Sequence, residues 1–313
     1  MRTIVDGTGT RLAWRAALAA ALAVSLTGCS IKTVAINALG NALAEGGSSW
    51  ATDDDPELVR DATPFALKTI ESLIVQSPRH RGLLLAAASG FTQYSYAFVQ
   101  SEADYTEARD LAAATEMRAR AVRLYLRARD YGLRGIEVGH AGFSARVRGD
   151  AAGALGEVSS KADVPLLYWT AAPMAAAAAL AKENGELAAD LPVSAAMMRR
   201  ALELDEGFGD GAIYDFFIAY DGGRPASAGG SFERARADLD KALALARGRR
   251  IAPLVGFAET VSVATQNRAE FTALLKRAIA FDAESVAEQR LANVVAQRRA
   301  RWLLSRADEL FVE

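Results

Sequence analysis

The chain has 313 residues, of which 51% are hydrophobic and 24% are charged. This balance excludes a disordered chain and a protein built from many membrane-spanning helices. A net charge of −2 gives no attraction to nucleic acid, and one cysteine with two histidines excludes a disulfide framework and a zinc site made of these residues.

The N-terminus has the features of a secretory signal peptide. Arg2, Arg11 and Arg15 precede the apolar run 16–26, which is shorter than the roughly 20 residues of a membrane-spanning helix. The run ends in Leu-Thr-Gly-Cys, which resembles the bacterial lipobox whose cysteine is acylated. A plain signal peptide is the alternative, but the only cysteine of the chain, Cys29, stands at the cleavage point. We therefore predict lipidation at Cys29 and attachment to a membrane.

Three segments follow from this interpretation. They are a lipoprotein signal peptide (1–28), a lipidated N-terminus with a glycine- and serine-containing tether (29–52), and a single helical-repeat domain (53–313). Ser30, not an aspartate, follows the cysteine, and the resemblance to Gram-negative sorting signals favours the outer membrane over the inner one. We expect the mature chain to be lipid-anchored on the periplasmic side.

Helix signals occupy almost all of the remaining chain, and strand signals are scarce. Asp53–Asp55 precede Pro56 and begin a helix in which Leu58 and Phe65 recur at helical spacing, until Ser77-Pro78 ends it. The three aspartates could attract a cation, but the spacing of a calcium-binding loop is missing and a helix start explains them. Further helices are expected at about 83–100, 105–131, 166–182, 192–204, 211–220, 231–247, 254–265, 269–281 and 285–311.

Internal similarity between these helices favours a repeat. Residues 200–205 look like the end of a tetratricopeptide repeat, and residues 277–282 repeat the pattern. The small-large-alanine signature of such repeats occurs at Ala121/Tyr125/Ala128 and at Ala235/Leu239/Ala242. The intervals between matches are irregular, and an unrelated helical bundle is the alternative. We predict an all-α fold of antiparallel helical hairpins, stacked as a cryptic tetratricopeptide-like array.

No residue pattern indicates catalysis. His80 and His140 lie in turn-like contexts, where a solvated histidine is the simpler interpretation than a general base. The stretch with Gly207, Gly209 and Gly211 follows a helix, whereas a dinucleotide site requires a preceding strand, so it indicates a turn. We predict no catalytic residue, no metal site and no cofactor.

Aromatic residues form the first candidate for binding. Phe91, Tyr94 and Phe98 share one helix face, and Tyr168 and Trp169 stand shortly before a run of five alanines, 175–179. Alanines leave no bulk to fill space, so neighbouring helices come very close or a cavity remains. The aromatic stripe is therefore either core or the lining of a hydrophobic ligand pocket.

A basic cluster near the C-terminus forms the second candidate. One interpretation is the solvated outer face of the last helix. The other is a binding face for an acidic partner or a carboxylate, because arginine pairs with carboxylates through two hydrogen bonds and, like tryptophan, is enriched in interface hot spots. The residues are Gln297, Arg298, Arg299, Arg301 and Trp302.

Several segments, together with the lipobox, resemble the T component (TatT) associated with tripartite ATP-independent periplasmic (TRAP) transporters. The similarity covers essentially the whole mature chain in matching order. The segments are DDDPELVR at 53–60, TIESL at 69–73, GLLLAAASGFTQY at 82–94, LYLRARDYG at 124–132, DVPLLYW at 163–169 and LANVVAQRRARWLL at 291–304.

This resemblance implies a periplasm-facing lipoprotein of tetratricopeptide-like hairpins, with its lipidation site at Cys29. It implies a homotrimer, because the chain is similar to members that form trimers, and partnership with the transporter's periplasmic solute-binding protein. A hydrophobic or carboxylate ligand passing through a channel in the body is a further implication. The resemblance brings no catalytic residues. We expect a non-enzymatic accessory of solute uptake; a structural helical-repeat lipoprotein scaffold in envelope assembly is the alternative.

Overall fold

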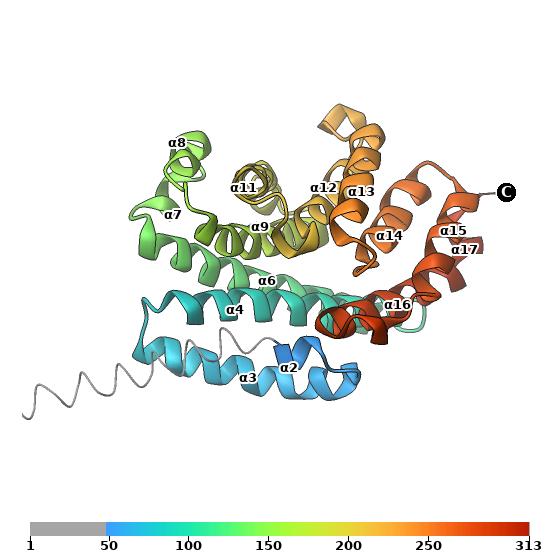
Figure 1. Ribbon diagram of the computed structural model, residues 1–313, viewed down its shortest axis with the longest axis horizontal. Helices are drawn as coiled ribbons and strands as arrows, with labels where there is room; N and C mark the ends of the chain where they lie inside the picture. Colours follow the sequence, from blue (N-terminus) through green and yellow to red (C-terminus); the bar gives the residue numbers. More distant parts are fainter. Residues whose placement is uncertain (1–47, 313) are drawn as a thin grey trace, which may run out of the picture.

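The structure is a computed structural model that describes residues 48–312, in which every regular element is a helix (Figure 1). This confirms the all-α fold class. The predicted signal peptide, Cys29 and most of the tether lie outside the described residues. Within residues 48–312, no helix combines the length and the apolar character that crossing a membrane requires.

The first half of the fold is a stack of long helices in which α3 packs on α4, α4 on α6 and α6 on α9 (Figure 1). A π-helical segment, η1, joins α4 to α5 without interruption, and short helices lie between α6 and α9. The bounds are α2 Ser48–Ala51, α3 Pro56–Gln76, α4 Arg81–Tyr94, η1 Ser95–Gln100, α5 Ser101–Thr106, α6 Leu111–Gly139, α7 Phe143–Arg146, α8 Ala151–Gly156, η2 Lys161–Asp163 and α9 Val164–Leu180.

The second half consists of shorter helices, among which α12 packs on α13 and α15 on α16. The predicted last helix, 285–311, is divided here into two 3₁₀ turns and two α-helices. The bounds are α10 Gly185–Ala188, α11 Leu191–Leu204, η3 Phe208–Asp210, α12 Ala212–Gly222, η4 Ala226–Ala228, α13 Phe232–Ala246, α14 Ala252–Phe257, η5 Ala258–Ser262, α15 Arg268–Ile279, η6 Ala283–Ser285, η7 Ala287–Gln289, α16 Arg290–Ser305 and α17 Ala307–Leu310.

Polar side chains mark the helix starts. Asp55 accepts a hydrogen bond of 3.0 Å from the backbone N–H of Leu58, with Pro56 at the first helical position, as the sequence predicts. Asp110 caps α6 in the same way, by accepting from Ala113. This cap sets the start of α6 at residue 111 and leaves the predicted helix start at 105 inside α5.

Two glycines let α6 and α9 come into close contact. A Cβ atom on Gly132 would lie 2.2 Å from Thr170 Oγ1, and one on Gly135 would lie 2.5 Å from Leu166 Cδ2. In the alanine run at the end of α9, Ala177 and Ala178 are buried in a core that also contains side chains of α4 and α6. Small residues on both helices therefore bring the layers together.

The repeat signature falls on buried positions. Ala121, Tyr125 and Ala128 are at most 1% exposed, and Ala235, Leu239 and Ala242 are at most 3% exposed. These residues occupy helix contacts, as small and large positions of a tetratricopeptide hairpin do. The repeat itself stays a prediction, because burial alone does not establish a repeating unit.

The apolar face of α3 differs from the one that the sequence predicts. Leu58 and Phe65 are 59% and 79% exposed, whereas Val59, Leu67 and Ile74 are buried. Helix α3 lies at the edge of the stack and α4 covers only one of its sides (Figure 1). Leu58 and Phe65 therefore point away from the core.

Candidate functional site

Helix α16 brings the end of the chain back to its beginning. In Figure 1 it lies near α2 and the N-terminal part of α3, and it contacts both helices. Arg290, its first residue, donates a hydrogen bond of 2.9 Å to the carbonyl of Thr52. Contacts of α16 with the first helices, α2 and α3, therefore close the array.

Arg299 is the buried centre of this closure. Its side chain is 9% exposed, its Nη1 lies 2.9 Å from Asp104 Oδ2 on α5, and it forms two hydrogen bonds with Glu259 on the π-helical segment η5. Burial opposes the charge on Arg299, but the attraction of Glu259 and Asp104 outweighs it and raises the pKa of the guanidinium. The charge is therefore retained and matched inside the chain.

Arg298 makes a second, more exposed set of ion pairs beside Arg299. Its Nη1 lies 3.0 Å from Glu57 on α3, and its Nη2 lies 2.8 Å from Glu102 on α5. We call Glu57, Glu102, Asp104, Glu259, Arg298 and Arg299 the closure contact. It joins four helical segments from both halves of the sequence.

The other members of the predicted basic cluster divide between core and surface. Gln297 is buried and donates hydrogen bonds to carbonyl groups at the end of α15, the shortest being 2.7 Å to Phe281. Trp302 packs against Tyr105 with ring centroids 5.3 Å apart, and Arg301 is exposed. Four of the five side chains thus have partners within the chain, and both Arg298 and Arg301 are exposed to solvent. Their role in binding a partner or a carboxylate stays a prediction.

Both π-helical segments face this region. Tyr96 on η1 is 45% exposed, yet burial and the negative charge of Glu259 on η5 raise its pKa to about 12. π-Helical segments frequently occur at functional sites, and here two of them place side chains near Arg299.

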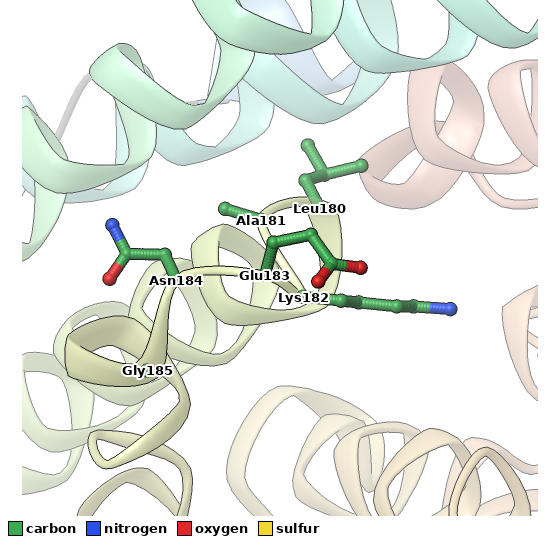
Figure 2. A pocket seen from close by; sticks show the side chains of 6 residues that line it. All are labelled: Leu180, Ala181, Lys182, Glu183, Asn184 and Gly185. Atoms are coloured by element: carbon green, nitrogen blue, oxygen red, sulfur yellow. The ribbon is translucent and has the colours of Figure 1, made fainter.

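A pocket of about 530 Å³ lies at the C-terminal end of α9. Figure 2 shows Leu180 and Asn184 pointing to the same side of the turn into α10, whereas Lys182 extends sideways. The turn that lines the pocket comprises Leu180, Ala181, Lys182, Glu183, Asn184 and Gly185. Its volume lies within the range of small-molecule sites, and one cation and one anion among its residues offer no net charge preference. The space thus opens just beyond the alanine run, whose buried members pack closely.

Four of the five aromatic candidates lie in two separate core clusters, and the five do not line one pocket. Phe91, Tyr94 and Phe98 belong to a cluster with residues of α3, α4 and α6. Tyr168 packs against Phe208, with ring centroids 5.2 Å apart, in a cluster of α9, α11 and α12, and burial raises its pKa to about 12. Trp169 contacts Tyr168 edge-on. None of the five lines the pocket at the end of α9, and their role in ligand binding stays a prediction.

The two histidines take part in helix-end contacts. His80 caps α4 by accepting a hydrogen bond of 3.1 Å from Leu83. His140 lies 3.1 Å from Asp163, which also pairs with Arg81. Among residues 48–312 no group of three or more histidine, cysteine, aspartate or glutamate side chains is placed to hold a metal ion.

Comparison with known proteins connects this closed helical array to transport. A protein-family model described as "TRAP transporter T-component" matches residues 52–311. The chain belongs to the TRAP transporter T-component family. It is also 31% identical, over 303 residues, to an uncharacterized protein of Treponema pallidum (strain Nichols), and the similarity covers 91% of this chain and 94% of that protein.

The family match covers the described fold from the residue after α2 to the end of α17. The match begins four residues before α3 and ends one residue after α17. It therefore contains the closure contact, the pocket at the end of α9 and both π-helical segments. The family places this chain in a TRAP transport system.

Sequence reasoning missed the acidic half of the closure contact. Asp104 and Glu259 pair with Arg299 across 195 and 40 residues of sequence. Neither carboxylate stands in a motif, so no local pattern connects it to the arginines. Only the fold of the T-component brings them together.

Proposed function

We propose that this T-component is a non-enzymatic accessory of a TRAP solute uptake system that binds the periplasmic solute-binding protein. The family match over residues 52–311 carries the proposal. A T-component is one part of a transport system, and a periplasm-facing part meets the solute on its receptor. The proposal assigns the chain the task of holding partners, with no step of bond making or breaking.

The proposal includes attachment through an acylated Cys29 on the periplasmic side, more specifically on the outer membrane. Support comes from the lipobox at residues 26–29. Replacement of Cys29 by serine should release the protein from the membrane fraction, and density-gradient separation of membranes should place the wild type with the outer membrane. Retention of the Cys29→Ser variant in membranes would contradict lipid anchoring.

The proposal also includes a ligand with an apolar part. The pocket at the end of α9 supports it, because Leu180 and Ala181 provide an apolar surface beside polar groups in a volume of about 530 Å³. A hydrophobic fluorophore should bind the purified protein, and Leu180→Asp should weaken the uptake. Equal uptake by both proteins would place the ligand elsewhere.

The decisive experiment measures binding to a TRAP solute-binding protein from the same organism. Residues 30–313, immobilised on a sensor, should bind that receptor saturably and with micromolar affinity. The control is an unrelated solute-binding protein of similar size and charge. If the soluble body recovers envelope-assembly factors from periplasmic extract and does not bind the receptor, the scaffold function replaces the transport function.

A homotrimer is part of the proposal, on the basis of the family resemblance. Light scattering on residues 30–313 should give three times the mass of one chain at micromolar concentration. A monomeric mass under these conditions would rule the trimer out. The receptor measurement does not depend on this result.

A further inference from the structure

A groove of about 330 Å³ lies between α3 and α6, apart from the closure contact and from the pocket at the end of α9. One wall comes from the C-terminal half of α3 and the other from the C-terminal half of α6. Its lining consists of Lys68, Glu71, Ser72, Ile74, Val75, Pro78, Arg127, Tyr131 and Arg134. The volume is at the lower end of the range for small-molecule sites.

Glu71 organises the polar side of the groove. It is 7% exposed and accepts hydrogen bonds of 2.7 Å from Lys68 and from the hydroxyl of Tyr131, and Arg127 Nε lies 2.5 Å from it. Burial opposes its ionisation, but these donors outweigh burial and lower the pKa of the carboxyl. An ionised, buried Glu71 therefore holds three donors at the edge of the groove.

Aromatic rings support the two arginines. Phe91 and Tyr131 stack with centroids 6.0 Å apart and an interplanar angle of 14°. The guanidinium carbon of Arg127 lies 5.1 Å from the centroid of Phe91, and that of Arg134 lies 5.3 Å from the centroid of Tyr131. The ring contacts only the face of the guanidinium, so the N–H groups at the guanidinium edge can still donate hydrogen bonds to another group.

The side chains that line the groove carry more positive charge and more hydrogen-bond donors than its one carboxylate can match. Lys68, Arg127 and Arg134 carry three positive charges and Glu71 carries one negative charge, which leaves a net charge of +2 among the lining residues. Arg134 has five N–H donors, and within residues 48–312 its only hydrogen bond is one of 3.4 Å to the carbonyl of Pro78. No described carboxylate pairs with it.

Two of the lining residues are apolar and exposed. Val75 is 75% exposed, and Pro78 at the start of the turn after α3 is also exposed. Exposed apolar side chains next to Arg134, which no described carboxylate pairs with, match a ligand that has an oxyanion at one end and a hydrocarbon part at the other.

We propose that this groove binds a small organic anion, with its carboxylate or phosphate group on Arg127 and Arg134 and its apolar part against Val75 and Pro78. Bidentate pairing with the oxyanion would use N–H groups of Arg127 and Arg134 for which residues 48–312 supply no acceptor. The inference extends the proposed function by locating an anionic ligand. It does not depend on receptor binding, because the T-component alone contains the groove.

Calorimetric titration of the purified protein with three probes tests the groove. Benzoate and phenyl phosphate carry the two candidate oxyanions, benzyl alcohol is the neutral control, and sodium chloride holds the ionic strength constant. Benzoate or phenyl phosphate should bind saturably with Kd of about 1 mM or below, and the tighter one identifies the oxyanion class. No saturation by either anion up to about 20 mM, or equal binding of benzyl alcohol, would overturn the proposal.

Two matched arginine variants separate a built site from general charge attraction. Arg134→Gln should weaken binding of the better anion about tenfold or more, because a hydrogen bond to a charged group is lost. Arg123→Gln makes the same charge change on an exposed position of α6 outside the groove and should weaken binding less than about twofold. Equal weakening by the two variants would overturn the proposal.

A third variant tests the apolar wall. Val75→Ser should reduce the preference for benzoate over acetate and leave acetate binding unchanged, since only the hydrocarbon contact is altered. Circular dichroism should show unchanged helix content for all three variants, because none of the three positions is buried. An unchanged preference would contradict the placement of the apolar part.

Discussion

At the scale of single residues, neighbouring groups determine which carboxylates keep their charge. On α13, Asp238 is partly buried and lies near the negatively charged Asp221, which is itself paired with Arg234 at 2.8 Å. Burial, followed by the repulsion of Asp221, raises the pKa of Asp238 to about 6. This residue therefore bears a charge at neutral pH in an unfavourable position.

Replacement of Asp238 by asparagine should stabilise the protein above pH 6. The pKa of Asp238 is higher in the folded state than its ordinary value of 3.8, so the folded state binds more protons between these values. Its contribution to stability consequently falls as pH rises from about 4 to about 6. Because the group is only partly buried, we expect a gain of about 1 kcal/mol at pH 7.

Urea unfolding of the wild type and Asp238→Asn at several pH values between 4 and 8 measures this difference. The exposed carboxylate two residues along α13 supplies the control, and Asp240→Asn should change stability by less than about 0.5 kcal/mol. A wild-type stability that rises relative to Asp238→Asn between pH 4 and 6 would reverse the assigned sign.

The two arginines of the closure contact should differ in their effect on stability. Arg299→Met leaves Glu259 without its ion-pair partner and leaves Asp104 with Arg118 alone, and should lower the free energy of unfolding by about 3 kcal/mol. Arg298→Met removes ion pairs whose side chains are 30–55% exposed, and should cost about 0.5 kcal/mol. Chemical denaturation compares them, and equal losses would contradict a buried centre at Arg299.

At the scale of secondary-structure elements, glycines decide how closely two helices pack. Glycine in a helix interior is unfavourable by about 1 kcal/mol relative to alanine. Gly132 and Gly135 are nevertheless part of α6, because the backbone and side chains of α9 occupy the space of their missing Cβ atoms. The unfavourable propensity is offset by the close contact of α6 with α9.

Gly132→Ala should therefore destabilise the protein although alanine is the better helix former. The new Cβ would lie 2.2 Å from Thr170 Oγ1 and 3.1 Å from its Cα, so the helices must separate, at a cost of about 2 kcal/mol. Gly139, at the end of the same helix, has nothing within 4 Å of its Cβ position. Gly139→Ala should stabilise by about 0.5 kcal/mol, and thermal unfolding of both variants measures the contrast.

The sequence predicts that these helices exist, but it does not always predict the residues at which they begin and end. Apolar spacing and caps such as Asp55-Pro56 are local signals, and the helices they predict are present. The predicted break between residues 100 and 105 is wrong, because the helix continues through η1 into α5. The break comes after α5, where Asp110 caps the start of α6. Exposure of Leu58 and Phe65 depends on how many neighbours α3 has, which helical spacing does not encode.

The candidate sites required contacts between distant residues. The arginine cluster on α16 was visible as a run of like charges, but its carboxylate partners come from α3, α5 and η5. The aromatic residues were visible as a stripe, and their division into two cores depends on packing around α4 and α9. The groove at Glu71 joins α3 to α6 across 60 residues of sequence, and no motif marks it.

At the scale of the whole molecule, closure couples parts of the chain that an open array keeps independent. In a linear repeat protein each unit contacts only its neighbours, and the ends unfold separately. Here the closure contact joins α3, α5 and η5 to α16. Loss of order in α16 should therefore be transmitted to the first half of the fold.

Hydrogen exchange in the Arg299→Met variant tests this coupling. Residues 95–106 of η1 and α5 should exchange about tenfold faster than in the wild type, together with α16, because local opening requires less free energy once the ion pair between Arg299 and Asp104 is lost. Arg298→Met should change exchange in both regions by less than about threefold, since its ion pairs are exposed. Faster exchange confined to α16 would contradict the coupling. It would mean that α16 contacts the first half of the fold without stabilising it.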